Sequence, residues 1–364
     1  MSRLIMTPAT GERLLRFVGD RVRFTLRGSD GAPLPPGWRV FVRTNLGRGK
    51  ILRQEIISSY PRRPTLANAA WHDVALERCG DEWTRELTLI EPGFFRAKAY
   101  AVDPEGRQHW PEGDDAGISI HPDQYRTANT IYCAFIRMFG DAKQAVSTKN
   151  PPLEAQLAEL EKRKFTTIPA SGRIRDLIKE LPFIIDTLGC RILQLLPVNP
   201  TPTTFARFGR FGSPYASQDL TAIDPALIEF DQRTTGIDQF CELTNAAHAR
   251  GARVFIDIVI NHTGWGARLQ EKHPEWYLRD EKGNFVSPGA WGVVWEDLVE
   301  LDHRNVALWA DLAETFLIWC RRGVDGFRCD AGYKVPLRAW RYITARVLDE
   351  FPDTVFLLEG LGGS

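Results

Sequence analysis

The 364-residue sequence lacks several features that would assign it to a class at once. No apolar run approaches the roughly 18 residues of a membrane-spanning helix, and no N-terminal stretch is apolar enough for a signal peptide. The 46 basic and 46 acidic residues cancel without forming blocks of one sign, so neither nucleic acid nor a membrane is an expected partner. The sequence has no Gly-x-Gly-x-x-Gly after a strand and no Walker-type loop, which argues against a nucleotide-binding protein.

Cysteine is also scarce, and none of the six cysteines forms a Cys-x-x-Cys pair. Several of them lie within apolar runs, which is typical of small buried side chains with free thiols. With no leader and no disulfide framework, we expect a soluble protein of the reducing cytoplasm. Aromatic residues, in contrast, are abundant, with 11 Trp, 20 Phe and 8 Tyr. Such rings fill large cores, and they also serve as flat platforms in sugar-binding sites.

Residues 1–125 predict an all-β sandwich domain, because short stretches of alternating hydrophobicity are separated by polar turns. The clearest of these stretches are Arg21–Leu26, Arg39–Arg43, Arg85–Ile90 and Phe94–Val102. Such a domain would either pack against the rest of the protein as a support or bind polysaccharide, and the sequence leaves both functions open.

Residues 126–364 predict a second domain in which strands alternate with helices around a parallel sheet. We expect strands at 130–135, 191–196, 253–260, 324–329 and 354–358, and helices at 153–164, 174–188, 237–250, 305–321 and 337–350. This alternation permits a doubly wound sheet or a barrel, and the long segments after the second and third strands favour a barrel. Residues 263–301 predict an inserted subdomain, whose rings would pack its own core or stack on a sugar; these are Trp265, Trp276, Tyr277, Trp291 and Trp295.

Three of the predicted strands end in polar or charged residues, within the runs 257–262, 326–331 and 356–360. At the carboxyl ends of barrel strands such residues form active sites. Asp330 and Glu359 lie about 30 residues apart, the length of one βα unit, so their side chains should enter one pocket. Arg328 lies two residues before Asp330 and therefore on the same face of its strand. Two carboxylates with a neighbouring Arg and His262 suit the cleavage of a glycosidic bond, although each residue alone is more often structural.

The order and spacing of these runs over residues 128–364 resemble the α-amylase clan of glycoside hydrolases, glycoside hydrolase family 13. The resemblance implies a (β/α)8 barrel, of which about the first five βα units are present here. It also implies roles for five residues: Asp330 as nucleophile, Glu359 as general acid and base, Arg328 as partner of the nucleophile, His262 as a contact to the sugar, and Asp257 as support of the pocket. The run Gly212-Ser213-Pro214-Tyr215 resembles the segment that supplies a stacking tyrosine, so Tyr215 would lie under a sugar ring.

The resemblance suggests no required cofactor, and one metal, a structural calcium ion with Asn261 among its ligands. Many α-amylases carry Lys-His three and four residues after the nucleophile, where this sequence has Tyr333 and Lys334. That departure favours relatives that process glycogen.

We therefore predict a retaining hydrolase of glycogen, starch or maltodextrin. The alternatives are a maltosyltransferase-like enzyme that uses the same glycosyl-enzyme intermediate, or an inactive binding homologue. The clan's His-Asp region after the seventh strand has no counterpart, so we expect a longer protein, and no glucan turnover by residues 1–364 alone.

Overall fold

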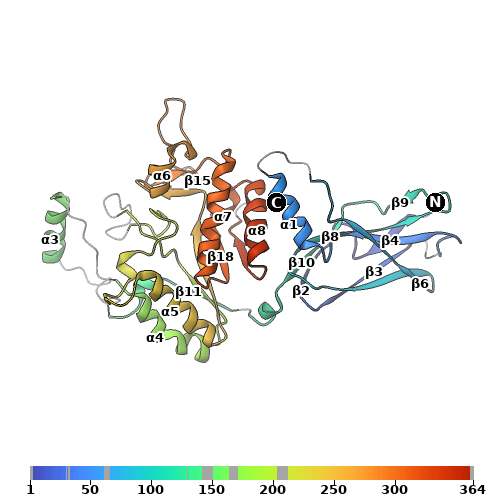
Figure 1. Cartoon of the computed structure of the whole chain (residues 1–364), viewed down its shortest axis with the longest axis horizontal. Helices are drawn as coiled ribbons and strands as arrows, with labels where there is room; N and C mark the ends of the chain where they lie inside the picture. The colour runs from blue at the N-terminus through green and yellow to red at the C-terminus, as the bar shows by residue number, and fades with distance from the viewer. Residues whose placement is uncertain are drawn as a thin grey trace. The chain divides into compact units, whose positions relative to one another are not determined.

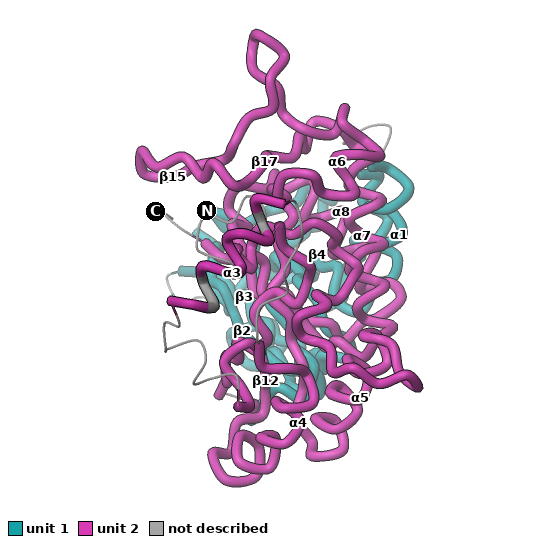
Figure 2. The backbone as a smooth tube through the Cα atoms, turned by 90° about the vertical axis from the view of Figure 1, so that its left-hand side faces the viewer, with its two compact units in different colours: residues 1–127 teal, residues 128–364 magenta. Residues whose placement is uncertain are grey.

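The computed structural model describes residues 3–29, 31, 33–60, 66–128, 130–141, 151–163, 171–202 and 212–360. The chain forms two compact units, residues 1–127 and residues 128–364, which are coloured separately in Figure 2. Each unit is described here by itself.

Unit 1 contains two sheets. The first has four strands in the order β1-β3-β7-β6, and the second has β2-β10-β8-β4-β5 with β9 paired to β8. The strands are β1 (Leu4–Thr7), β2 (Arg13–Phe17), β3 (Arg21–Gly28), β4 (Arg39–Thr44), β5 (His72–Ala75), β6 (Glu77–Cys79), β7 (Glu82–Thr88), β8 (Gly93–Val102), β9 (Gln108–His109) and β10 (Ala116–His121).

The two sheets share one apolar core, to which most of the strands contribute alternate residues. Phe24 and Leu26 of β3 are buried in it together with Val42 of β4 and Ile118 of β10. The predicted β-sandwich is thereby confirmed.

The expectation that this domain is all-β was wrong at one place, because residues Gly49–Ser59 form helix α1 between β4 and β5. The segment is rich in good helix formers and has no alternating stretch, so its local preference is helical.

Unit 2 is built on a parallel sheet of five strands in the order β11-β12-β13-β18-β19. The strands are β11 (Ile131–Ala134), β12 (Ile192–Leu195), β13 (Arg253–Val259), β18 (Gly326–Asp330) and β19 (Val355–Leu358). Each is hydrogen-bonded to the next strand along the sheet. Every residue of β13 after Arg253 is buried, as expected of a strand covered on both faces.

Helices connect these strands, as the sequence predicted, and they are α3 (Pro151–Lys162), α4 (Ile174–Leu181), α5 (Gly236–Ala249), α7 (Val306–Arg321) and α8 (Leu337–Glu350). Figure 1 shows α4 beside α5, and α7 beside α8. The predicted helix over 174–188 was only partly right, since α4 ends at Leu181 and a π-helical turn covers Pro182–Thr187. Pro182 has no amide hydrogen, so the regular hydrogen-bond ladder cannot continue through it.

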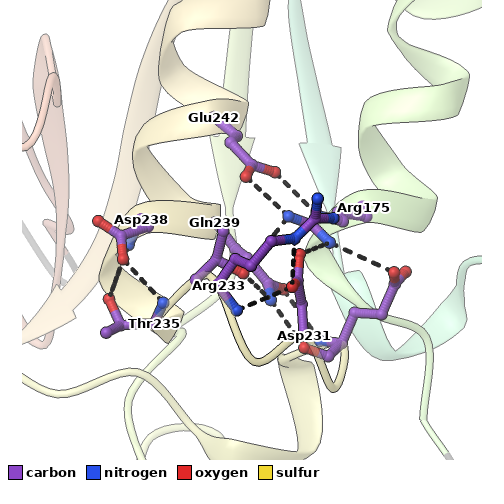
Figure 3. Close-up of polar contacts among 9 residues, drawn as sticks. Arg175, Asp231, Arg233, Thr235, Asp238, Gln239 and Glu242 are labelled. Carbon is purple, nitrogen blue, oxygen red and sulfur yellow. Dashed lines mark hydrogen bonds and ion pairs between the residues drawn. The ribbon is translucent and has the colours of Figure 1, made fainter.

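Arg175 joins α4 to α5 through a cluster of carboxylates (Figure 3). Its guanidinium bonds both oxygens of Glu242 at 2.8 Å, and it also bonds Asp231 at 3.1 Å and Glu229 at 3.3 Å. Beside this cluster, Thr235 and Asp238 cap the N-terminus of α5 in a reciprocal capping box.

A long segment follows β13 before α7. It contains the short strands β14 (His262–Gly264) and β17 (Leu298–Glu300), which pair with each other, and the hairpin of β15 (Gly289–Ala290) and β16 (Val293–Val294). Helix α6 (Arg268–Lys272) lies between β14 and β15 in the sequence. Trp276 and Tyr277 are buried within this segment, whereas Trp291, at the tip of the hairpin, is 78% exposed.

Candidate active site

The carboxyl ends of β13, β18 and β19 bring together the charged residues that the sequence singled out. In the parallel register Asp257 lies opposite Arg328, and Val259 lies opposite Asp330. Glu359 follows the last residue of β19, and its amide donates to the carbonyl of Cys329 at 3.0 Å. Because side chains alternate along β18, Arg328 and Asp330 share a face, while Phe327 and Cys329 are fully buried on the other.

Arg328 lies at the centre of this group and binds three carboxylates. Its Nη1 atom bonds Asp330 Oδ1 at 2.6 Å and Asp257 Oδ1 at 3.0 Å, while its Nη2 atom lies 2.9 Å from Glu359 Oε1. A planar guanidinium presents several donors in fixed directions, which suits this shared arrangement.

Glu359 has a second partner. Its Oε2 atom accepts a hydrogen bond of 2.7 Å from the backbone amide of Ala331, the residue after Asp330. Ala331 adopts a left-handed conformation with φ of 47°, which is uncommon for a residue with a side chain. Such local strain is often found at functional sites, and here it turns the amide towards the carboxylate.

Burial and mutual repulsion shift the acidity of this group. Burial raises the pKa of Asp257 to about 7, against the opposing effect of Arg328. Burial also raises the pKa of Asp330 above its ordinary value of 3.8, and the charge of Glu359 adds to that rise, while Arg328 opposes it. The surrounding carboxylates raise the pKa of Arg328, so it stays charged.

Tyr215 and His262 lie beside the carboxylates. The hydroxyl of Tyr215 donates to Asp257 Oδ2 at 3.3 Å, and burial raises the pKa of that hydroxyl. His262 is 1% exposed, and burial lowers its pKa to about 3, so the ring is neutral. Neither ring nitrogen has a partner at hydrogen-bonding geometry among the described residues, and the ring borders a cavity. An interaction with the backbone of Tyr215 opposes part of the lowering of the pKa of His262.

The cavity has a volume of about 310 Å³. Its lining combines the carboxylates Asp330 and Glu359 with several aromatic rings, and the lining residues are Ser213, Tyr215, His262, Trp291, Trp295, Asp297, Leu298, Asp330, Ala331, Tyr333 and Glu359. A neutral polyhydroxylated ligand would find both flat apolar surfaces and hydrogen-bonding groups there.

The segment after β13 contributes more to the cavity than the sequence predicts. The sequence leaves open whether Trp291 and Trp295 pack a subdomain core or stack on sugar, and it gives no signal for Asp297. Lys334 ties this segment to the loop after β18, because its ammonium bonds the carbonyl of Gly289 and lies 5.1 Å from the ring centre of Trp295. The sequence signal for this part of the site is the presence of two tryptophans, Trp291 and Trp295, within and beside the short hairpin of β15 and β16.

A second cavity, of about 290 Å³, lies elsewhere in unit 2 and has a different character. Its lining includes Asp219, Arg268 and Glu314, and Asp219 pairs with Arg268 at 3.2 Å. It contains none of the three carboxylates that Arg328 holds, so the chemistry places the candidate site in the aromatic cavity.

Asn261, which the resemblance linked to calcium, is 2% exposed, and its amide has no partner among the described residues. A calcium ion takes roughly six to eight oxygen ligands. No group of three or more His, Cys, Asp or Glu side chains suited to a metal gathers among the described residues. Calcium also accepts backbone carbonyl and water oxygens, so a calcium site at Asn261 stays a prediction.

The comparison with known families agrees with this geometry. Residues 120–354 match the family described as "Alpha amylase, catalytic domain". The chain belongs to the α-amylase family. The chain spans only about a third of the length of the curated relatives it matches.

One relative of this α-amylase-family chain is an alpha-1,4-glucan:maltose-1-phosphate maltosyltransferase of Burkholderia pseudomallei, 32% identical over 355 residues. The alignment covers 80% of this chain and 30% of that protein. An α-amylase from Lactobacillus plantarum is similar in structure, with a TM-score of 0.52, 31% identity and coverage of 65% of this chain and 46% of that one. The predicted barrel class is confirmed by these neighbours, although the five described strands form an open sheet.

A type III pullulan hydrolase from Thermococcus kodakarensis shares the fold over both units, with a TM-score of 0.52, 16% identity and coverage of 98% of this chain and 61% of that one.

Among the described residues, no helix is both long and apolar enough to cross a membrane.

Proposed function

We propose that this protein cleaves α-glucosidic bonds with retention of configuration, using Asp330 as the nucleophile and Glu359 as the general acid and base. The observation that carries the proposal is the position of Arg328, which holds both carboxylates at the edge of the aromatic cavity. Two carboxylates held by one guanidinium are close neighbours. Retaining enzymes place their carboxylates about 5–5.5 Å apart, and inverting enzymes need about 6.5–9.5 Å to admit a water molecule.

In the first half-reaction Asp330 attacks the anomeric carbon while Glu359 protonates the departing glycosidic oxygen. A covalent bond forms between carboxylate and sugar, and the bond from the anomeric carbon to the leaving oxygen breaks. Arg328 favours the ionised form of Asp330 that this attack requires. Glu359 must gain a proton and release its present donors, Arg328 and the amide of Ala331, as the substrate enters.

In the second half-reaction Glu359 removes a proton from the acceptor, which attacks the same carbon and releases Asp330. Water as acceptor gives hydrolysis, and a sugar hydroxyl gives transfer. We favour transfer, in agreement with the name of the Burkholderia relative, and we propose an α-1,4-glucan as acceptor with a maltosyl group transferred. The aromatic rim of the cavity supports this choice, because Trp291 and Tyr333 offer apolar surfaces to a second sugar.

Two experiments test the proposal. Incubation of the whole protein with a maltosyl fluoride slowed by a second fluorine on the ring should release fluoride and add one fluoromaltosyl group to the enzyme, and peptide mass spectrometry should locate that group on Asp330. Product analysis with maltose 1-phosphate and maltodextrin should then show chains lengthened by maltosyl units. Labelling at another residue would refute the nucleophile assignment, and release of free maltose without longer chains would refute transfer.

A further inference from the structure

Unit 1 carries a groove of about 450 Å³ on the outer face of its six-stranded sheet, which the proposed catalytic chemistry does not use. Its lining residues are Arg43, Asn68, Trp71, His72, Asp73, Lys98, Trp110 and Asp115. All of them belong to unit 1, so the groove is defined by that unit alone.

The strand register explains how these residues meet. Arg43 of β4 lies opposite Asp73 of β5 on one side and Lys98 of β8 on the other. The neighbouring residues Val42 and Ala97 point into the sandwich core. The alternation therefore directs the polar side chains away from the core and onto the outer face.

Aromatic rings form one wall of the groove. Trp110 stacks on Tyr100 with ring centres 4.2 Å apart and planes 15° apart, and Tyr100 stacks in turn on Phe41 at 5.7 Å. Tyr100 is almost fully buried, whereas Trp110 remains 37% exposed. A rigid stack with one exposed indole is a ready platform for a flat apolar ligand surface, and Trp71 lines the same groove.

The polar part of the groove is balanced in charge. Arg43 bonds both oxygens of Asp73, at 3.0 and 2.9 Å, and its guanidinium lies 5.9 Å from the ring centre of Trp110. Lys98 and Asp115 add one charge of each sign. The lining therefore matches neither an anion nor a cation, but it offers many donors and acceptors to hydroxyl groups. His72 also lines the groove, and its buried Nδ1 atom has no hydrogen-bond partner among the described residues.

From this combination we infer that the groove between Trp71 and Trp110 is a non-catalytic binding site for a neutral α-glucan chain. The aromatic rings stack on the apolar faces of the sugar, and the charged floor bonds its hydroxyls. The identity of the ligand rests on the proposed function, whereas the existence of the site rests on the geometry of unit 1. Such a site holds the polymer on the enzyme independently of the catalytic cavity.

Calorimetric titration of the whole chain with maltoheptaose tests this inference. The protein used is the Asp330→Asn variant, in which the proposed nucleophile is removed so that the ligand is not cleaved during the titration. We expect a binding event that Trp110→Ala weakens by about tenfold or more, the loss typical of truncating a central aromatic anchor. Trp71→Ala should weaken the same event, and Trp110→Phe should retain part of it.

Phe94→Ala is the matched control, because Phe94 is 45% exposed on β8 of the same sheet and does not line the groove. It should leave the titration unchanged. Tyr215→Ala separates the two sites, since it should affect only binding in the catalytic cavity. A Trp110-dependent event that survives Tyr215→Ala supports the groove even if the proposed function fails. Binding that is insensitive to both tryptophan variants, or no binding at all, overturns the inference.

Discussion

Arg328 and Glu359 form an ion pair of 2.9 Å through Nη2, while Nη1 of the same guanidinium is shared by Asp257 and Asp330. The positions of three carboxylates from three neighbouring strands thus depend on one side chain. A change in the shape of that cation, even without a change in charge, should disturb all three.

In the whole protein, Arg328→Lys should therefore lower kcat/KM on maltodextrin on the order of 100-fold, comparable with the loss of one well-placed donor at a reacting centre. The lysine keeps the positive charge but lacks the planar fork that reaches Asp330 and Glu359 together. Initial-rate measurements check this, with Arg321→Lys as control. Arg321 makes a similar forked contact with Glu350 on the exposed faces of α7 and α8, and its replacement should leave the rate unchanged. Comparable activity of both variants would contradict the role of Arg328.

The pH dependence of the first half-reaction should report Asp330. The proposed nucleophile must be ionised, and its pKa is raised above 3.8 by burial and by Glu359. Activity should consequently fall, as the pH is lowered, at a higher pH than an ordinary aspartate would give. Glu359→Gln removes one cause of the rise, so the acidic limb should move to lower pH. A glycosyl fluoride donor is used because its leaving group needs little protonation. An unmoved limb, or one moved to higher pH, would contradict the assignment.

Much of this site could be predicted because parallel strands buried on both faces leave a strong pattern. The polar residues at the ends of β13 and β18 interrupt apolar runs, and the βα spacing places them at one edge of the sheet. The individual roles of Asp257 and Tyr215 came from family resemblance, and their spacing alone would not have given them. The contact between Tyr215 and Asp257 depends on how a long loop folds back onto the sheet.

Other features could not be predicted from the hydrophobic pattern of the sequence. Helix α1 has only a weak apolar stripe, and Gly49 is its one buried residue, so periodicity did not distinguish it from a connecting loop. The left-handed conformation of Ala331 is imposed by tertiary contacts, including its bond to Glu359, since alanine has no preference for it. Likewise, Trp291 is exposed because it lies at the tip of the hairpin of β15 and β16. The sequence of this tryptophan-rich segment does not indicate where that hairpin turns.

Trp291→Ala should lower kcat/KM for long maltodextrins by about tenfold, because an exposed ring at the cavity is lost as a stacking surface. The thermal unfolding midpoint of the variant should stay close to that of wild type, since the ring of Trp291 is 78% exposed and its removal costs little packing. Val293→Ala is the control, because Val293 lies on the same hairpin, is 50% exposed and does not line the cavity. The two variants are compared on short and long substrates. Equal effects of both would show that the hairpin acts only through its fold.

Arg175→Ala should lower the thermal midpoint at neutral pH, because it leaves Glu229, Asp231 and Glu242 facing one another without their shared cation. Arg175 lowers the pKa of Glu242 and contributes to lowering that of Asp231 to about 2. Carboxylates with a lowered pKa in the folded state stabilise the fold above their unfolded pKa, and this contribution is lost as the pH falls through the folded value. The difference between wild type and Arg175→Ala should therefore narrow in acid.

Arg233→Ala is the matched control for that experiment. The side chain of Arg233 also pairs with Asp231, at 3.3 Å, but it is 89% exposed, and the backbone amide of Arg233, which bonds Asp231 at 2.9 Å, is kept in the alanine variant. Exposed pairs of this kind add little to stability, so this variant should melt close to wild type. Circular dichroism melts at neutral and acidic pH measure both effects. If Arg233→Ala lowered the midpoint as much as Arg175→Ala, general surface charge rather than the α4–α5 cluster would account for the stability of this region.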